Sequence, residues 1–160
     1  MAIDVAKVEI KSVSDASGFE DLILSGRMNA DSIIAVIGKT EGNGGVNDFT
    51  RILSDQSYRS ILTKHGSRNQ TEINTIPMVW SGGCDGVITP HATVFSDNEQ
   101  IGSTNDSRLV IGTAISDVIR PEEIGRLAMV DKVAAAVQLA MTDAGITDTS
   151  DVHYVQTKTP

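Results

Sequence analysis

The sequence predicts a mixed fold of the α/β (α+β) class, in which strands and helices alternate along the chain. Apolar runs of strand length recur, segments with helical spacing and capping residues separate them, and the order of elements starts again after a polar stretch. The chain has 160 residues, of which 40% are hydrophobic. This is enough to form a core, and the length fits one domain or two small ones.

Four strands are expected in the first part of the chain. Residues 5–13 (VAKVEIKSV) alternate between apolar and polar, which is typical of a half-buried strand. Residues 33–37 (IIAVI) form a continuous apolar run, and residues 76–80 and 91–95 form two shorter candidates. The second and third candidates each run into a glycine-rich segment, so both strands are predicted to end in tight loops.

Two helices are expected between these strands. Ser17 is predicted to cap the first helix, with Glu20 completing a capping box and Gly26 ending the helix. Asn47 is predicted to cap the second. This second helix carries a set of apolar residues at helical spacing, namely Phe49, Ile52, Leu53, Ile61 and Leu62.

The polar segment 96–107 (SDNEQIGSTNDS) is the best linker in the chain. After it we expect a strand over residues 108–115, a helix with Pro121 in its first turn and Gly145 at its end, and a strand over residues 152–157. The elements before and after the linker therefore follow the same order, which indicates a weak internal repeat.

A short match supports this repeat. Lys39 and Thr40 leave one predicted strand, and Lys158 and Thr159 leave its counterpart. The second part has no equivalent of the later half of the first. We therefore predict a first repeat domain over residues 1–103 and the opening part of a second over 104–160.

Composition excludes several classes of function. The net charge is −8 and no basic cluster occurs, so neither nucleic acid nor an anionic membrane is an expected partner. No apolar run approaches the length of a membrane span, and the first residues do not form a signal peptide. The single cysteine, Cys84, fits a reducing compartment, so we expect a cytoplasmic protein. The three histidines lack metal-ligand spacing, and we predict no metal and no cofactor.

The loop that begins Gly38-Lys39-Thr40 has two interpretations. It is not a P-loop, because Ile33 stands where the first glycine of that motif is required. Nucleotide binding therefore remains only as an alternative, and ATP with magnesium would test it. Lys39 and Lys158 are candidates for a general base or for the activation of a serine. The competing interpretation is that both are ordinary strand-end lysines in contact with solvent.

A second loop, Ser81-Gly82-Gly83, could hold an oxyanion with its backbone N–H groups. The nucleophile-elbow pattern is absent because Val79 occupies its first glycine position, so a plain turn is the alternative. Arg51 suits a planar carbonyl or carboxylate partner, although a surface ion pair is the commoner use of such a residue. Cys84 is either a nucleophile or a buried thiol.

Several short sequence motifs, taken together and in their order along the chain, favour one interpretation of its function. In their order they resemble the cyanuric acid hydrolase and barbiturase family of ring-opening amidohydrolases, over nearly the whole chain. The strings that carry the resemblance are SDASG (14–18), GKTEGNGGVND (38–48), TR (50–51), SGG (81–83), GVITPH (86–91), PEEIGR (121–126), DAGI (143–146) and DVHYVQTKTP (151–160).

The resemblance implies a Toblerone-type fold, in which three repeats surround a pseudo-threefold axis and each supplies a lysine, an arginine and a serine. It also implies a flat cyclic imide as substrate, attacked by a serine whose base is a lysine. Carried over by motif, the substrate-binding residues are Lys39, Arg51, Ser81 and Gly82. Lys158 is implied to be the catalytic lysine of the Ser-Lys dyad.

The chain also departs from the family pattern. It ends just after Lys158, without the serine that this lysine would activate and without the third repeat. We therefore expect the remainder of the enzyme to come from another part of the protein or another chain, in a homo-oligomer that the family implies is a homotetramer. Cys84 and Asp85 differ from the Thr-Glu of the cyanuric acid branch, which leaves barbiturate open as substrate. The alternative function is a non-catalytic trimeric scaffold that binds a small ligand.

Overall fold

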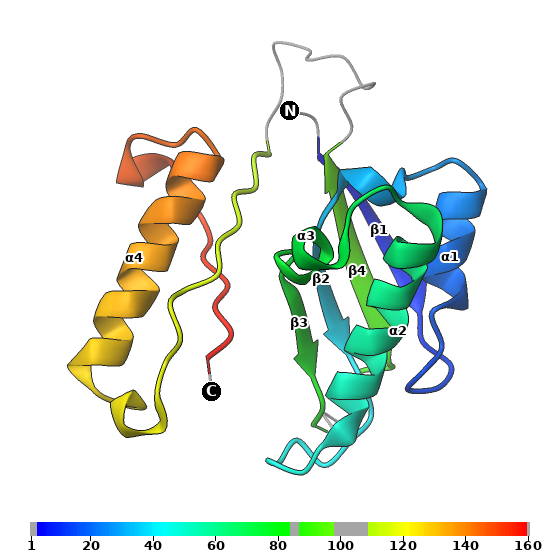
Figure 1. Cartoon of the computed structure of the whole chain (residues 1–160), viewed down its shortest axis with the longest axis horizontal. Coiled ribbons are helices and arrows are strands. Elements are labelled where there is room, and N and C mark those ends of the chain that lie inside the picture. The colour runs from blue at the N-terminus through cyan, green and yellow to red at the C-terminus, as the bar shows by residue number, and fades with distance from the viewer. Residues whose placement is uncertain (1–2, 84–86, 98–108, 160) are drawn as a thin grey trace. The chain divides into compact units, whose positions relative to one another are not determined.

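The computed structural model describes residues 3–83, 87–97 and 109–159 (Figure 1). The chain divides into two compact units, residues 1–107 and 108–160. The predicted boundary between two repeat domains falls in a stretch outside the described residues, so it stays a prediction. Among the described residues, no helix has both the length and the apolar character that a membrane span requires.

The first unit is built on a four-stranded mixed sheet. Its strands are β1 (Ile3–Glu9), β2 (Ile33–Lys39), β3 (Met78–Ser81) and β4 (His91–Asp97), in the spatial order β1-β4-β2-β3. β4 pairs antiparallel with both β1 and β2, whereas β2 and β3 are parallel. All four predicted strands are confirmed, although β1 begins and ends earlier than the alternation over residues 5–13 indicates.

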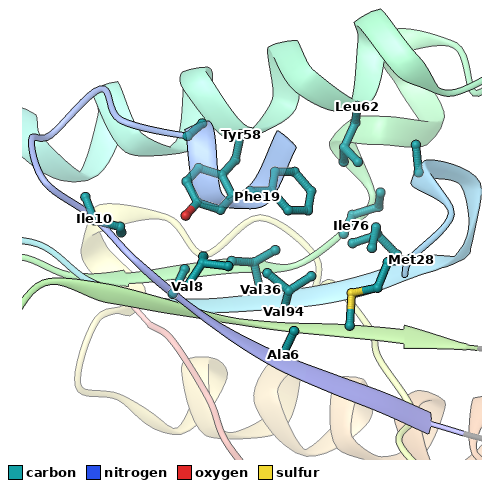
Figure 2. Close-up of a cluster of buried hydrophobic side chains, with 14 of the residues drawn as sticks. Ala6, Val8, Ile10, Phe19, Met28, Val36, Tyr58, Leu62, Ile76 and Val94 are labelled. Atoms are coloured by element: carbon teal, nitrogen blue, oxygen red, sulfur yellow. The ribbon is translucent and has the colours of Figure 1, made fainter. Parts of the chain in front are cut away.

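Among the described residues of this unit there are three α-helices, α1 (Ser17–Leu24), α2 (Phe49–His65) and α3 (Gln70–Asn74), and a short 3-10 turn, Ala30–Ser32. Apolar side chains of the helices and of one sheet face form a single core, in which those of α1 and α2 face those of the strands (Figure 2). At its centre the rings of Phe19 and Tyr58 stack with centroids 4.8 Å apart. This packing fixes α2 on the sheet, and the N-terminus of α2 thereby comes to lie beside the ends of β2 and β3.

Two predicted helix caps are wrong. Ser17 is the first residue of α1 rather than its cap, because the carboxylate of Asp15 accepts from both its N–H and its hydroxyl. Glu20 makes no capping box, since it accepts instead from the side chains of two residues in α2. The cap of α2 is Asp48, one residue after the predicted Asn47.

The buried side of α2 also differs from its apolar pattern. The stripe that faces the core consists of Ser54, Tyr58 and Leu62, and the Ser54 hydroxyl is satisfied there by donating to the carbonyl oxygen of Val13. Of the apolar residues named for this helix, three are exposed at its N-terminal end, namely Phe49, Ile52 and Leu53.

The second unit contains α4 (Leu127–Asp143) and two short 3-10 turns, Pro121–Glu123 and Thr149–Asp151. Pro121 was predicted in the first turn of the long helix, but it opens a separate turn, and α4 begins later. The predicted end of the helix is confirmed. Gly145 has a φ of +71°, its N–H bonds to Thr142 and the next N–H bonds to Met141, as in a Schellman motif.

The two strands predicted in the second unit are not formed. Within the described residues 109–159, both segments are extended but belong to no sheet. The topology of the first unit gives the reason. There β1 and β2 do not bond to each other, because both pair with β4, which lies between them and comes later in the sequence. The described part of the second unit has no such later strand, so its two segments lack the partner that would complete their ladders.

Candidate active site at the ends of two parallel strands

The sheet brings two of the predicted site residues together. Lys39 is the last residue of β2 and Ser81 is the last residue of β3, and the parallel register places them directly opposite each other. In Figure 1 both arrowheads point to the end of the sheet where α2 begins. The carboxyl ends of neighbouring parallel strands are a common position for ligand sites.

Lys39 is buried rather than directed into solvent, with only 6% of its surface exposed. Its Nζ donates to the carbonyl oxygens of Thr40 and Gly83 and lies 4.0 Å from a carboxylate oxygen of Glu41. A buried ammonium requires such oxygen partners to offset the loss of hydration. The result is a fixed positive charge beside the turn that follows β3, which contradicts the interpretation of Lys39 as an ordinary solvent-facing lysine.

Ser81 is exposed, but its backbone is held in place. Its carbonyl oxygen accepts from the N–H of Thr40 at 2.8 Å and from the Thr40 hydroxyl at 3.3 Å. Thr40 itself is only 1% exposed. A rigid backbone with an exposed residue at its end is the arrangement that a ligand-binding serine needs.

The carboxylate of Asp48 occupies the centre of the loops around these strand ends. One oxygen accepts from the Thr50 N–H at 3.0 Å and from the Thr50 hydroxyl at 2.5 Å, and the other accepts from the Gly44 N–H at 2.8 Å. The Thr50 hydroxyl lowers the pKa of Asp48 most, and the two N–H groups and the charge of Arg51 lower it further, against the opposing effect of burial. Asp48 is therefore an ionised acceptor at neutral pH.

Gly82 and Arg51 both lie against this carboxylate. A Cβ at Gly82 would stand 1.9 Å from Oδ2 of Asp48 and 3.2 Å from Cγ of Arg51, so only a glycine fits. Arg51 is half-buried in the first turn of α2 and donates from Nη2 to the carbonyl oxygen of Gly45. The structure thus gathers four of the five predicted residues, Lys39, Arg51, Ser81 and Gly82, at one end of the sheet.

The fifth residue, Lys158, belongs to the second unit. It is exposed and lies at the end of an extended segment outside any sheet, so the prediction that it directly follows a strand is wrong. Its role as the catalytic lysine stays a prediction. Cys84 and Asp85, which were considered for reactivity and substrate choice, lie outside the described residues.

Sequence reasoning missed the residues that hold the site together. Asp48, Thr40 and Thr50 are not among the predicted site residues, although an aspartate two residues before a threonine at a helix start is a recognisable capping signal. The signal was obscured because Asn47, the neighbouring residue, is an equally good cap by type. The tertiary contact with Gly82 was not visible in the sequence at all.

A shallow groove lined by residues of α2 and α3 is a weaker candidate for a functional site. Its arginine, Arg59, forms an ion pair with Asp55 at 2.7 Å and donates to the carbonyl oxygens of Ile73 and Ile76. These bonds fasten α3 and the start of β3 to α2. The arginine therefore has a structural role that already accounts for its position.

Comparison with known proteins places the chain among hydrolases. The family described as amidohydrolase ring-opening protein matches residues 4–160. Barbiturase 2 of Nocardioides sp. (strain ATCC BAA-499 / JS614) is 57% identical over 160 residues, which are 99% of this chain and 43% of that protein. Cyanuric acid amidohydrolase of Pseudomonas sp. (strain ADP) is 43% identical over 161 residues, again 99% of this chain and 44% of the relative. The chain thus spans less than half the length of these relatives.

Solved structures of cyanuric acid hydrolases are similar to this chain in fold as well as in sequence. A crystal structure of cyanuric acid hydrolase from A. caulinodans has a TM-score of 0.85 and 37% identity, over 96% of this chain and 42% of that one. A second cyanuric acid hydrolase, described in terms of evolution by structural concatenation, has a TM-score of 0.82 and 39% identity, over 93% and 42%. The mixed α/β class is confirmed by these neighbours and by the sheet. The chain belongs to the family of ring-opening amidohydrolases.

Proposed function

We propose that this chain is the N-terminal portion of an enzyme that hydrolyses a C–N bond of a cyclic amide and so opens its ring. The observation that carries the proposal is the cluster of Lys39, Arg51, Ser81 and Gly82 at the ends of β2 and β3, in a member of a ring-opening family. A flat ring with several carbonyl oxygens calls for this set of hydrogen-bond donors: an ammonium, a guanidinium, a hydroxyl and a backbone N–H.

Each of the four residues has a role in the proposal. The planar guanidinium of Arg51 and the hydroxyl of Ser81 donate to carbonyl oxygens of the substrate, and the Gly82 N–H adds a third donor. Lys39 supplies a fixed positive charge beside them, because its ammonium is buried and held by carbonyl oxygens. Donors arranged in this way stabilise the negative charge that grows on a ring oxygen when the carbonyl carbon is attacked.

The attacking group is not among these four. In the proposed reaction, a serine outside this chain attacks a ring carbonyl carbon while Lys158 accepts the hydroxyl proton. The ring C–N bond then breaks, and the nitrogen takes the proton from Lys158. Water next hydrolyses the resulting ester, which releases the opened product as an acid and restores the serine hydroxyl. No cofactor takes part in the proposed reaction.

Barbiturate is the favoured substrate, with cyanuric acid as the alternative. The two relatives named barbiturase are 57% and 52% identical to this chain, whereas relatives named cyanuric acid amidohydrolase are 40–44% identical. Both compounds are flat six-membered cyclic imides, so they call for the same donors. The difference in identity supports the choice between them.

The proposed enzyme is longer than this chain and contains further repeats. The later repeats supply the missing half of the second unit, the attacking serine and a third repeat, and so complete a Toblerone-type fold around one site. The extended segments of the second unit, which lack a strand partner, support this completion. We place the enzyme in the cytoplasm as a homo-oligomer, a homotetramer by resemblance to its family.

The test is a chimera in which residues 1–160 replace the corresponding part of Barbiturase 2, with turnover of barbiturate and cyanuric acid measured at steady state. Arg51→Ala is expected to raise KM, because it removes a donor to the substrate. The matched control is Arg27→Ala, since Arg27 also donates from Nη2 to a carbonyl oxygen, that of Val5, but is not one of the clustered residues. Equal KM values for the two variants would contradict the role of Arg51.

Lys158→Ala is expected to lower kcat by about 10²–10⁴-fold while leaving the fold intact, because it removes the proposed base. Retained turnover in this variant would contradict the assigned role of Lys158. A folded chimera that binds barbiturate without turning it over would favour the non-catalytic scaffold.

A further inference from the structure

Asp48 is a buried carboxylate to which the proposed reaction gives no role. Among the described residues it is the one acidic side chain in the buried set, with 5% of its surface exposed. Glycines enclose it on two sides. A Cβ at Gly42 would lie 2.3 Å from Oδ1, and a Cβ at Gly82 would lie 1.9 Å from Oδ2. The carboxylate is therefore closed off by backbone and acts on the site through its neighbours.

Its hydrogen bonds join the backbone segments that carry the candidate site. Oδ2 accepts from Gly44 in the loop after β2, and Oδ1 accepts from Thr50 at the start of α2. The Thr50 hydroxyl lies 2.9 Å from that of Thr40, and the Thr40 N–H donates to the carbonyl oxygen of Ser81. One network thus runs from the loop after β2, through Asp48, to the end of β3.

A helix cap alone does not account for this arrangement. A cap requires only that the side chain accept from an N–H of the first turn, which Asp48 does at Thr50. It does not require a bond to Gly44, nor that Gly82 pack directly on Oδ2. The positive charge of Arg51 also contributes to the lowering of the Asp48 pKa.

We infer that Asp48 is a positioning residue for the ring-opening reaction, which holds the Gly82 backbone and the Arg51 side chain where they bind the substrate. This inference rests on the proposed function. This one carboxylate contacts three segments of the site. It accepts hydrogen bonds from the loop after β2 and from the first turn of α2, and the turn after β3 packs against it. Losing its charge or one of its bonds moves donors that must stay aligned during the reaction.

Asp48→Asn in the chimera is the sharpest variant. It keeps the size of the side chain and one oxygen for Thr50, but it removes the charge and turns an NH₂ group toward the Gly44 N–H. We expect kcat to fall about 10- to 100-fold, because misplaced donors stabilise the transition state less well. The KM is expected to change much less, and the thermal midpoint by a few degrees.

Asp31→Asn is the matched control. Asp31 also accepts from a backbone N–H and a hydroxyl, both of Ser67 at 2.8 Å, and it also lies against a glycine, Gly66. It belongs to a different part of the first unit, the turn before β2. This variant is expected to lower the thermal midpoint by a similar amount and to leave kcat unchanged.

The outcomes are distinguishable. A wild-type chimera without turnover contradicts the proposed function. An active wild-type chimera with an unchanged kcat in Asp48→Asn, or with an equal loss in Asp31→Asn, overturns the inference about Asp48. If Asp48→Asn does not fold, Thr50→Val replaces it as the test, because it removes only the hydroxyl that links Asp48 to Thr40. A severalfold loss of kcat then supports the inference, and an unchanged kcat overturns it.

Discussion

Replacing Gly82 by alanine is expected to damage both stability and activity, and the structure allows the damage to be estimated. The added Cβ would stand 1.9 Å from Oδ2 of Asp48, whereas ordinary contacts begin at 3.4 Å. Either the carboxylate or the turn after β3 must move by about 1.5 Å, the difference between these two distances. Asp48 resists this movement because three hydrogen bonds hold it.

The loss of stability in Gly82→Ala has two sources, overpacking around the added Cβ and a broken hydrogen bond to Asp48. Overpacking a well-filled site costs about 1–3 kcal/mol. Breaking the bond from the Gly44 N–H to the charged carboxylate costs about 1.5–3 kcal/mol more. We therefore expect Gly82→Ala to lower the free energy of unfolding by about 2.5–6 kcal/mol and the thermal midpoint by about 10 °C or more.

Unfolding by urea, followed by tryptophan fluorescence, measures this change. Trp80 is the only tryptophan in the chain, is 4% exposed and immediately precedes Ser81 in β3. Gly45→Ala is the control, because the nearest atoms that its Cβ would meet are the side-chain oxygens of Asn43 and Asn47, at 3.2 and 3.4 Å, and both side chains are exposed. This control is expected to change stability by less than about 1 kcal/mol.

A double variant isolates the contact itself. Removing the carboxylate in Asp48→Ala makes room for the Cβ at Gly82, so the two substitutions are expected to be non-additive by about 1–2 kcal/mol. Additive effects, or a Gly82→Ala variant as stable as Gly45→Ala, would refute the close packing on which the site depends.

Three further predictions test other parts of the structure. Gly38→Ala places a Cβ 2.0 Å from the ring of Trp80, so it is expected to destabilise the first unit and shift the tryptophan emission; an unchanged spectrum and urea midpoint would contradict the packing. Hydrogen bonds from two side chains of α2 hold the pKa of Glu20 below its ordinary 4.5, so its stabilisation is present above pH 4.5 and is lost as pH falls through the folded-state pKa. The thermal midpoint is then expected to fall less steeply below pH 4.5 in Glu20→Gln than in the wild type, and equal slopes would contradict the ion pair. Amide hydrogens of residues 109–115 and 152–158, apart from the hydrogen-bonded ones of Thr113 and Val152, are expected to exchange rapidly in the 160-residue chain and slowly in the chimera; slow exchange in the chain alone would show that these segments find partners without the later repeats.

The strands of the first unit were predictable because their patterns are local. A continuous apolar run such as 33–37 predicts a strand by itself, and the glycine-rich loops mark where β2 and β3 end. The side-by-side placement of Lys39 and Ser81 needed only one further fact, that these two strands are parallel neighbours. The strand ends that carry Lys39 and Ser81 are therefore encoded by short-range signals, whereas the pairing that brings them together is not.

Other features depend on contacts between distant residues. The segments 109–115 and 152–157 have strand patterns, but a strand forms only with a partner, and in the first unit that partner is β4. Asp48 rather than Asn47 caps α2, and its carboxylate also lies against Gly82 in the turn after β3, a contact between residues far apart in the sequence. Asparagine and aspartate are equally good helix caps, so the sequence alone could not show which of residues 47 and 48 caps α2.

Turnover of barbiturate by the chimera, beside the 160-residue chain alone and Barbiturase 2 as positive control, tests the central claim most directly. We predict that the chimera opens the ring, that Lys158→Ala lowers the kcat of the chimera by about 10²–10⁴-fold, and that the chain alone shows no turnover. A chimera that folds and assembles but leaves barbiturate and cyanuric acid intact would contradict the claim, as would equal turnover by the chain alone.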